Sequence, residues 1–272
     1  MGLTYANGQL LSTTHVAMLA PDGQSLRMPR RTEYAMLEIG CSDWDTLDET
    51  DLDKHKGRAF LVSFEPLLDK YAVLLARGTR RYHGSAHDLA VPLAHHHRHG
   101  VVLPLAVSPR GGPFNITVHK RAGCSSLLAA NSTSTATWGR LCQHVLESRR
   151  VESVTLLQAM RLAGPATLPI RFLKIDAQGV DLKLVKALEA EAPGTLYRRV
   201  NSMQIETRTS QCTPLYEGQE TCDEARDFMV NLGYRSNHDC PKNRGWCERT
   251  MQFYRPSERS FVKARGPPVV AR

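Results

Sequence analysis

Short apolar runs alternate with amphipathic stretches through most of the chain. The apolar runs fall at about residues 34–40, 59–65, 101–107, 171–176, 202–206 and 250–255. Between them, apolar residues recur at helical spacing, as Val180, Leu184 and Leu188 do at i, i+4 and i+8. Strands that alternate with helices predict an α/β fold with a mainly parallel twisted sheet and helices on both faces.

Two helix starts carry capping boxes, in which a threonine and the residue three positions later each cap the other's backbone amide. Thr155 precedes Gln158, and Thr221 precedes Glu224. We expect the second helix to end at Gly233. The apolar residues that it should bury are Ala225, Phe228, Met229 and Leu232.

The segment after residue 107 carries signals for turns. A Pro- and Gly-rich stretch at 109–113 precedes residues 114–119, which we expect to return as the second strand of a hairpin. Residues 131–137 are rich in Ser and Thr and predict a loop.

The segment 172–181 carries the strongest indication of a ligand site. An apolar strand delivers Asp176 to its carboxyl end, and Gly179 turns the chain into a helix. A carboxylate at the end of a parallel strand faces a ligand crevice. We expect the polar residues of the helix to face solvent, namely Asp181, Lys183 and Lys186.

Two earlier strands end in the same way. Glu38 and Gly40 end the first, and glycine there lets the backbone approach a ligand closely. Glu65 ends the second strand, 25 residues after Gly40. An acidic residue about 20 residues beyond the glycine turn holds ribose hydroxyls in nucleotide-binding folds.

Taken together, these motifs resemble the FkbM family of S-adenosylmethionine-dependent methyltransferases over roughly residues 34–255. The matching motifs are Glu38-Ile39-Gly40 with Ser42-Asp43 and Asp45-Thr46, Phe64-Glu65-Pro66, Leu105-Ala106-Val107-Ser108, Cys124-Ser125-Ser126-Leu127, Leu173-Lys174-Ile175-Asp176 with Gly179, and Ile205-Glu206. The resemblance implies a Rossmann-like class I methyltransferase fold that binds S-adenosyl-L-methionine across the carboxyl ends of the strands.

The resemblance also implies roles for individual residues. Those that would bind the cofactor are Glu38, Gly40, Cys41 and Ser42 on the methionine side, Glu65 at the ribose, and Val107 and Ser108 at the adenine. Asp176 and Glu206 would point toward the methyl group and the acceptor, and Asp176 is the first candidate for the catalytic base. The expected reaction is O-methylation of a hydroxyl on a small-molecule or sugar-like acceptor.

Two departures from the family pattern keep other functions open. The family commonly has Glu where this chain has Gln178, and the glycine turn lacks a second glycine, with Asp43 to Asp45 in that region. One alternative is a non-catalytic S-adenosylmethionine-binding protein on the same fold. The other is a nucleic-acid methyltransferase, although Asp176 is not followed by the Pro-Pro-aromatic sequence typical of exocyclic-amine methylation.

Composition fits one globular enzyme domain. The chain has 272 residues, of which 42% are hydrophobic and 23% charged, enough to bury one sizeable core. We expect an N-terminal extension at residues 1–30, the methyltransferase domain at 31–256 and a basic tail at 257–272.

Charge and targeting signals limit which partners and which cellular compartment we expect. The net charge of +8 is partly concentrated in the tail, and no RNP-type strand or zinc-finger spacing supports nucleic-acid binding. No apolar run is long enough to span a membrane, and no secretory signal is evident at the N-terminus. The default expectation is therefore a cytoplasmic enzyme with a small-molecule acceptor.

The seven cysteines bear on the compartment. Four cluster near the C-terminus with the spacing C-x9-C-x17-C-x6-C, and no pair has the C-x2-C spacing of structural zinc. Reduced thiols are the default expectation. The alternative is an oxidising compartment with Cys212/Cys222 and Cys240/Cys247 bridges, and only there would the sequons at Asn115 and Asn131 have meaning.

Other polar and aromatic clusters do not point to a metal. The histidines at 95–97 and 99 lack nearby acidic or cysteine partners, and residues 48–53 lack the EF-hand spacing. We interpret both as solvated segments. Trp44 and Trp138 fit core or rim positions as well as they fit a ligand cover.

Overall fold

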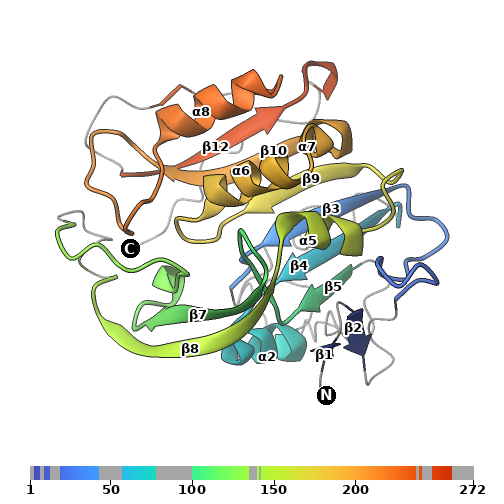
Figure 1. Cartoon of the computed structure of the whole chain (residues 1–272), viewed down its shortest axis with the longest axis horizontal. Helices are drawn as coiled ribbons and strands as arrows, with labels where there is room; N and C mark the ends of the chain where they lie inside the picture. The colour runs from blue at the N-terminus through green and yellow to red at the C-terminus, as the bar shows by residue number, and fades with distance from the viewer. Residues whose placement is uncertain are drawn as a thin grey trace.

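A central sheet of seven described strands organises the molecule, in the order β11-β12-β10-β9-β3-β4-β5 (Figure 1). The computed structural model describes residues 3–6, 9–12, 19–42, 57–77, 100–134, 140, 142–236, 239–240 and 247–258. The parallel strands are β3 (Tyr34–Ile39), β4 (Ala59–Phe64), β5 (Gly100–Leu103), β9 (Ile170–Ile175) and β10 (Val200–Arg208). Strand β12 (Glu248–Tyr254) runs antiparallel between β10 and β11 (Arg235–Ser236). The predicted mainly parallel sheet is confirmed.

The chain changes direction across the sheet at β3. It runs outward from β3 through β4 to β5 on one side, and later from β9 to β10 on the other. The carboxyl ends of β3 and β9 therefore lie at a topological switch point. In open α/β sheets this is where ligands bind, because the following loops diverge and leave a crevice.

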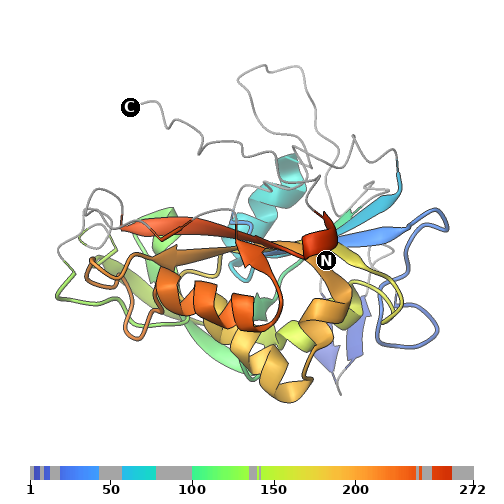
Figure 2. The same ribbon diagram turned by 90° about the horizontal axis from the view of Figure 1, so that it is seen from above.

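Helices cover both faces of the sheet, as predicted. Among the described helices, α2 (Leu68–Arg77) lies on one face, whereas α5 (Leu156–Leu162), α6 (Asp181–Glu191), α7 (Thr195–Arg199) and α8 (Cys222–Asn231) lie on the other (Figure 2). Both predicted capping boxes are present, at the starts of α5 and α8. Helix α8 ends before Gly233, as predicted, and Gly233 has a φ of +92° that favours glycine.

The core follows the alternation of the strands. Strands β3 and β4 are buried along their whole length, as expected for parallel strands covered on both faces. Alternate residues Ala35, Leu37 and Ile39 join the large core under α5, α6 and α8. Tyr34 and Met36 pack on the opposite face. Leu26, from the segment expected to be an extension, also lies in the large core.

Four short elements lie outside this architecture. At the N-terminus, β1 (Leu3–Ala6) and β2 (Gln9–Ser12) form an antiparallel pair. Single turns of 3-10 helix occur as η2 (Ala122–Cys124) and η3 (Pro256–Glu258). No described helix is long and apolar enough to cross a bilayer.

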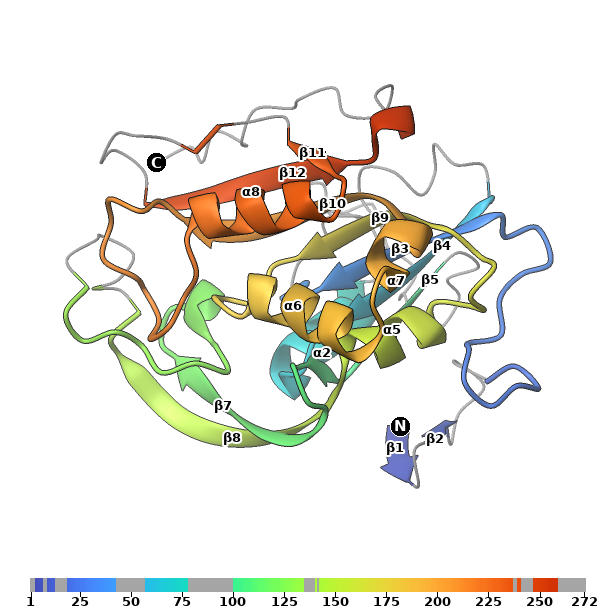
Figure 3. The ribbon, with the colours of Figure 1, turned by 45° about the horizontal axis from the view of Figure 1, so that its top comes forward.

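A second sheet of three strands lies between β5 and β9 in the sequence and beside the carboxyl ends of the central strands (Figure 3). It consists of β6 (Ala106–Val107), β8 (Val145–Val154) and β7 (Gly112–His119), in that order. The expected strand at 101–107 is therefore two strands, because Pro104 has no N–H to continue the ladder. The expected hairpin is also wrong, because β7 pairs with β8.

Disulfides account for six of the seven cysteines, which contradicts the expectation of reduced thiols. The bridges are Cys124–Cys142, Cys212–Cys247 and Cys222–Cys240. The expected Cys212/Cys222 and Cys240/Cys247 pairing is wrong. Antiparallel pairing places Arg208 of β10 opposite Glu248 of β12, and this brings Cys212 and Cys247, just beyond those ends, together. Cys41 is buried and takes part in no disulfide.

Candidate functional site

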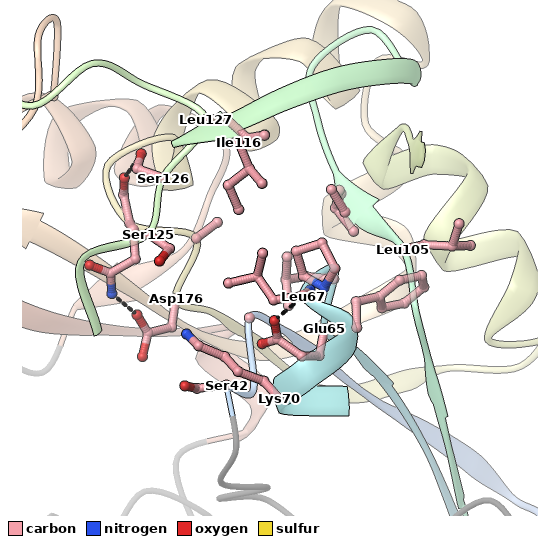
Figure 4. A pocket seen from close by; sticks show the side chains of 18 of the residues that line it. Ser42, Glu65, Leu67, Lys70, Leu105, Ile116, Ser125, Ser126, Leu127 and Asp176 are labelled. Carbon is pink, nitrogen blue, oxygen red and sulfur yellow. Dashed lines mark hydrogen bonds between the residues drawn. The ribbon is translucent and has the colours of Figure 1, made fainter. Parts of the chain in front are cut away.

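A pocket opens at the switch point, between the ends of the central strands and the second sheet (Figure 4). It encloses about 730 Å³, including the part open to solvent. One wall comes from the loops after β3, β4 and β9, and the other from β6, β7 and the segment 123–127. Its polar lining residues are Ser42, Glu65, Lys70, Ser125, Ser126, Asp176 and Gln178. Its apolar lining includes Leu67, Leu105, Val107, Ile116 and Leu127.

Gly40 fixes the close approach of two loops at the base of the pocket. Its φ is +78°, and a Cβ built there would lie 2.0 Å from the carbonyl oxygen of Asp176. Two backbone hydrogen bonds hold this arrangement. The Gly40 amide donates to the Phe64 carbonyl, and the Asp176 amide donates to the Ile39 carbonyl. Only glycine fits this position.

Glu65 follows β4 and lines the pocket while only 3% of its surface is exposed. The Leu67 amide donates to its Oε1 at 2.9 Å. Burial raises the pKa of Glu65 from 4.5 to about 7, against the lowering effects of the Lys70 charge and of the Leu67 and Ser42 amides. Glu65 is thus a carboxyl that changes its charge near neutral pH inside a ligand-sized pocket.

Asp176 faces the pocket from the end of β9, with 33% of its side chain exposed. Gln178 Nε2 donates to Asp176 Oδ1 at 2.8 Å, and Lys174 Nζ lies 3.7 Å from Oδ2. The Tyr216 hydroxyl donates to Gln178 Oε1 at 2.9 Å, and Ser126 Oγ donates to the Gln178 carbonyl at 2.6 Å. The orientation of the Asp176 carboxylate is therefore fixed on both oxygens.

Gln178 itself has a backbone conformation that is uncommon outside glycine. Its φ is +52°, in the left-handed region. Such strain persists only where surrounding contacts determine it, and it clusters at functional sites. In this loop the contacts are the hydrogen bonds to Asp176, Tyr216 and Ser126.

Glu206 does not line the pocket, although it was expected to point toward the acceptor. It lies behind Gln178, whose Nε2 is 3.5 Å from Glu206 Oε2. Burial, and after it the charges of Asp176, Glu248 and Asp181, raise the pKa of Glu206 well above its usual range. Because Glu206 lies outside the pocket lining, its contact with the pocket residues runs through Gln178.

Three residues expected to bind the cofactor lie outside the pocket lining. Glu38 is fully buried and pairs with Lys174 at 2.9 Å, because β3 and β9 are in register at these two residues. The Cys41 thiol donates to the Phe64 carbonyl at 3.6 Å. Ser108 is buried against Ser153, with their hydroxyls 2.8 Å apart. Gly40, Ser42, Glu65 and Val107 do line the pocket.

Asp181 is buried, so the expectation that it faces solvent is wrong. Its carboxyl accepts hydrogen bonds from the amides of Gly179 and Glu206, each at 3.2 Å. It thus ties the loop after β9 to β10. Burial and the nearby Asp176 charge raise its pKa to about 8, against the lowering effect of backbone amides. The sequence signal was an acidic residue in the first turn of a helix, where the helix dipole favours a carboxylate.

Other expected features fall outside the described residues. These are Asp43, Trp44, Asp45, residues 48–53, the histidines at 95–97 and 99, and Trp138. Within the described part of the chain, no group of three His, Cys, Asp or Glu side chains is arranged to hold a metal ion.

Comparison with known proteins assigns the chain to a family. No curated protein matches the sequence. Among solved structures, magnesium protoporphyrin IX methyltransferase from Synechocystis PCC 6803 with bound SAM is 6% identical, with a TM-score of 0.37 over 83% of this chain and 72% of that chain. A TM-score this low supports no conclusion about this chain. The sequence model of the methyltransferase FkbM domain matches residues 29–236, three-quarters of the chain, and the protein therefore belongs to the FkbM methyltransferase family.

Proposed function

We propose that this FkbM-family methyltransferase binds S-adenosyl-L-methionine at the switch-point pocket and methylates a hydroxyl group of a small-molecule or sugar-like acceptor. One observation carries the proposal. Glu65 and Asp176, which follow β4 and β9, line a single pocket on either side of the Gly40 turn.

The lining residues fit the cofactor. Glu65 offers acceptor oxygens for the two ribose hydroxyls, and its burial makes an ionised carboxylate there costly until donors arrive. Apolar side chains such as Val107 and Leu105 suit the adenine ring. Ser42 and the Gly40 backbone would border the methionine part. Glu38 supports this wall from behind through its ion pair with Lys174.

When bound, the cofactor supplies a methyl group on a sulfonium, which needs no further activation. The task of the protein is to align the acceptor hydroxyl and to take up its proton. We assign both tasks to Asp176, which faces the pocket, and none to Glu206, which lies behind Gln178 and outside the pocket lining. Gln178 and Lys174 hold the Asp176 carboxylate in place while leaving lone pairs for the acceptor.

Isothermal titration calorimetry tests the cofactor. S-adenosylmethionine and its demethylated product should both bind, whereas NAD should not. Glu65→Ala should weaken S-adenosylmethionine binding by about 1.5–3 kcal/mol, the range for hydrogen bonds to a charged group. Lys183→Ala is a matched control, because Lys183 lies on α6, outside the pocket lining. Equal affinity of wild type and a folded Glu65→Ala variant would contradict the ribose assignment.

A second candidate is a cofactor-binding protein without turnover. It is favoured by the hydrogen bond from the Gln178 amide, which occupies one oxygen of Asp176. Methyl transfer from labelled cofactor to a panel of sugars, polyols and phenols separates the two functions. Labelled product that is lost in Asp176→Asn supports catalysis. Tight cofactor binding with no labelled product from any acceptor supports the binding protein.

A further inference from the structure

Three disulfides indicate where this chain folds. They join six cysteines, of which five are buried, from Cys124 at 0% exposure to Cys212 and Cys240 at 9%, and Cys247 is half-buried. Cys222–Cys240 joins the start of α8 to the segment after β11, and Cys212–Cys247 joins the loop after β10 to the start of β12, at sequence separations of 18 and 35. Disulfides of this kind form and persist in oxidising compartments such as the lumen of the endoplasmic reticulum. The same compartment attaches N-linked glycans to Asn-x-Ser/Thr sequons.

The first sequon, Asn115-Ile116-Thr117, lies on an edge strand. Strand β7 is at the edge of the three-stranded sheet, with Asn115 opposite Arg150 of β8. Asn115 is exposed, whereas Ile116 is buried and lines the pocket. Because side chains alternate along a strand, Asn115 points away from the pocket. A glycan on its Nδ2 would extend into solvent and leave the pocket open.

The second sequon, Asn131-Ser132-Thr133, forms a surface turn. Asn131 Oδ1 accepts hydrogen bonds from the Thr133 amide at 2.9 Å and from the Thr133 hydroxyl at 2.7 Å. Ser132 and Thr133 are exposed, and Asn131 is half-buried. The turn therefore engages the carboxamide oxygen, while within the described residues Nδ2 makes no hydrogen bond.

We infer that Asn115 and Asn131 both carry N-linked glycans, added in the oxidising compartment in which the three disulfides form. In the transfer, Nδ2 bonds to the anomeric carbon of an oligosaccharide as the bond from that carbon to the pyrophosphate of a lipid-linked donor breaks. One Nδ2 proton is released. Beyond the Thr117–Ser126 bridge β7 is an edge strand, and a bulky hydrophilic group at Asn115 would block its pairing with another chain.

The test uses the full chain, secreted from cultured eukaryotic cells behind an added signal sequence. Purified protein is treated with peptide N-glycosidase in ¹⁸O-water, which converts each glycosylated Asn to an ¹⁸O-labelled Asp that peptide mass spectrometry locates. Both sequon peptides should carry the label. Thr117→Ala and Thr133→Ala should each abolish one label and leave the other. Thr117→Ser and Thr133→Ser keep the hydroxyl and should retain both.

Asn231→Gln is the matched control, because Asn231 is exposed on α8 outside any sequon, and it should leave both labels unchanged. The serine variants separate loss of the sequon from misfolding, since they preserve the acceptor signal with a minimal change. An unlabelled Asn115 or Asn131 in secreted, disulfide-bonded wild type overturns the assignment of that site. Two unlabelled asparagines overturn the inference as a whole.

Discussion

Glu65 should make cofactor binding depend on pH near neutrality. Its pKa in the free protein is about 7, because burial outweighs the lowering effects of Lys70 and of two backbone amides. Ribose hydroxyls donate to an ionised carboxylate, so binding should favour the deprotonated form and release a proton. Below pH 7 each further unit costs about tenfold in affinity, so binding at pH 6 should be about tenfold weaker than at pH 8.

The assay is calorimetry from pH 5.5 to pH 8, repeated in two buffers of different ionisation enthalpy. The buffer dependence of the heat at pH 7 should report release of about half a proton. Glu65→Gln keeps the size of the side chain but cannot ionise, and it should bind more weakly with no such release. Glu248 and Asp181, with pKa values of about 7 and about 8, titrate in both proteins, so the difference between the proteins isolates Glu65.

The same raised pKa acts on stability with a defined sign. Between pH 4.5 and about 7 the folded protein binds a proton at Glu65 that the unfolded chain has lost. The contribution of Glu65 to the free energy of unfolding is therefore fully present below pH 4.5. It is lost as the pH rises through 7, and the total loss is about 3 kcal/mol. Above pH 7, Glu65→Gln should be more stable to urea than wild type. Two results together would refute the reasoning: a cofactor affinity that is constant from pH 5.5 to pH 8, and a Glu65→Gln variant that is no more stable to urea than wild type above pH 7.

Further predictions concern the proposed catalytic base Asp176, the Tyr216 hydrogen bond, the Gly40 turn and the cysteines. Asp176→Asn should lower turnover by about 10²-fold or more while leaving cofactor affinity nearly intact, and an equal loss of affinity would make it a binding residue. Tyr216→Phe removes the hydrogen bond to Gln178 and should lower kcat more than it changes KM, as steady-state kinetics would show. Gly40→Ala should cost more than about 2 kcal/mol in urea unfolding, from a left-handed φ and the clash with the Asp176 carbonyl. Alkylation of denatured, unreduced protein should modify Cys41 alone, and seven modified thiols would contradict the bridges.

The central sheet could be predicted because its signals are local. Runs such as residues 59–65 are apolar throughout, as expected for strands covered on both faces, and the capping boxes at Thr155 and Thr221 mark helix starts. The positions of Gly40, Glu65 and Asp176 at successive strand ends followed from the same pattern.

The second sheet could not be predicted, because its long strand does not have an apolar pattern. Strand β8 has the sequence VLESRRVESV and is exposed over most of its length, so it resembles a loop or a helix surface. Its partner β7 was consequently expected to pair with the wrong neighbour. The Ser125 and Ser126 side of the pocket was visible only as a family motif without a role.

Residues whose position depends on distant partners were also missed. Asp181 sits at a helix position that would normally face water, but it reaches the amides of Gly179 and Glu206. The disulfide pairing depends on β10 and β12 being antiparallel, which brings Cys212 to Cys247. Spacing along the chain does not contain this information.

The two walls of the pocket belong to separately hydrogen-bonded sheets, and this affects how the protein can change over evolution. The strand ends that present Gly40, Glu65 and Asp176 are constrained by the packing of the central sheet. The facing wall, with Ile116 and Leu127, belongs to the segment of the three-stranded sheet, which has its own strand pairing and its own Cys124–Cys142 bridge. Substitutions at Ile116 or Leu127 can therefore reshape this wall of the pocket while the strand ends that present Gly40, Glu65 and Asp176 keep their packing.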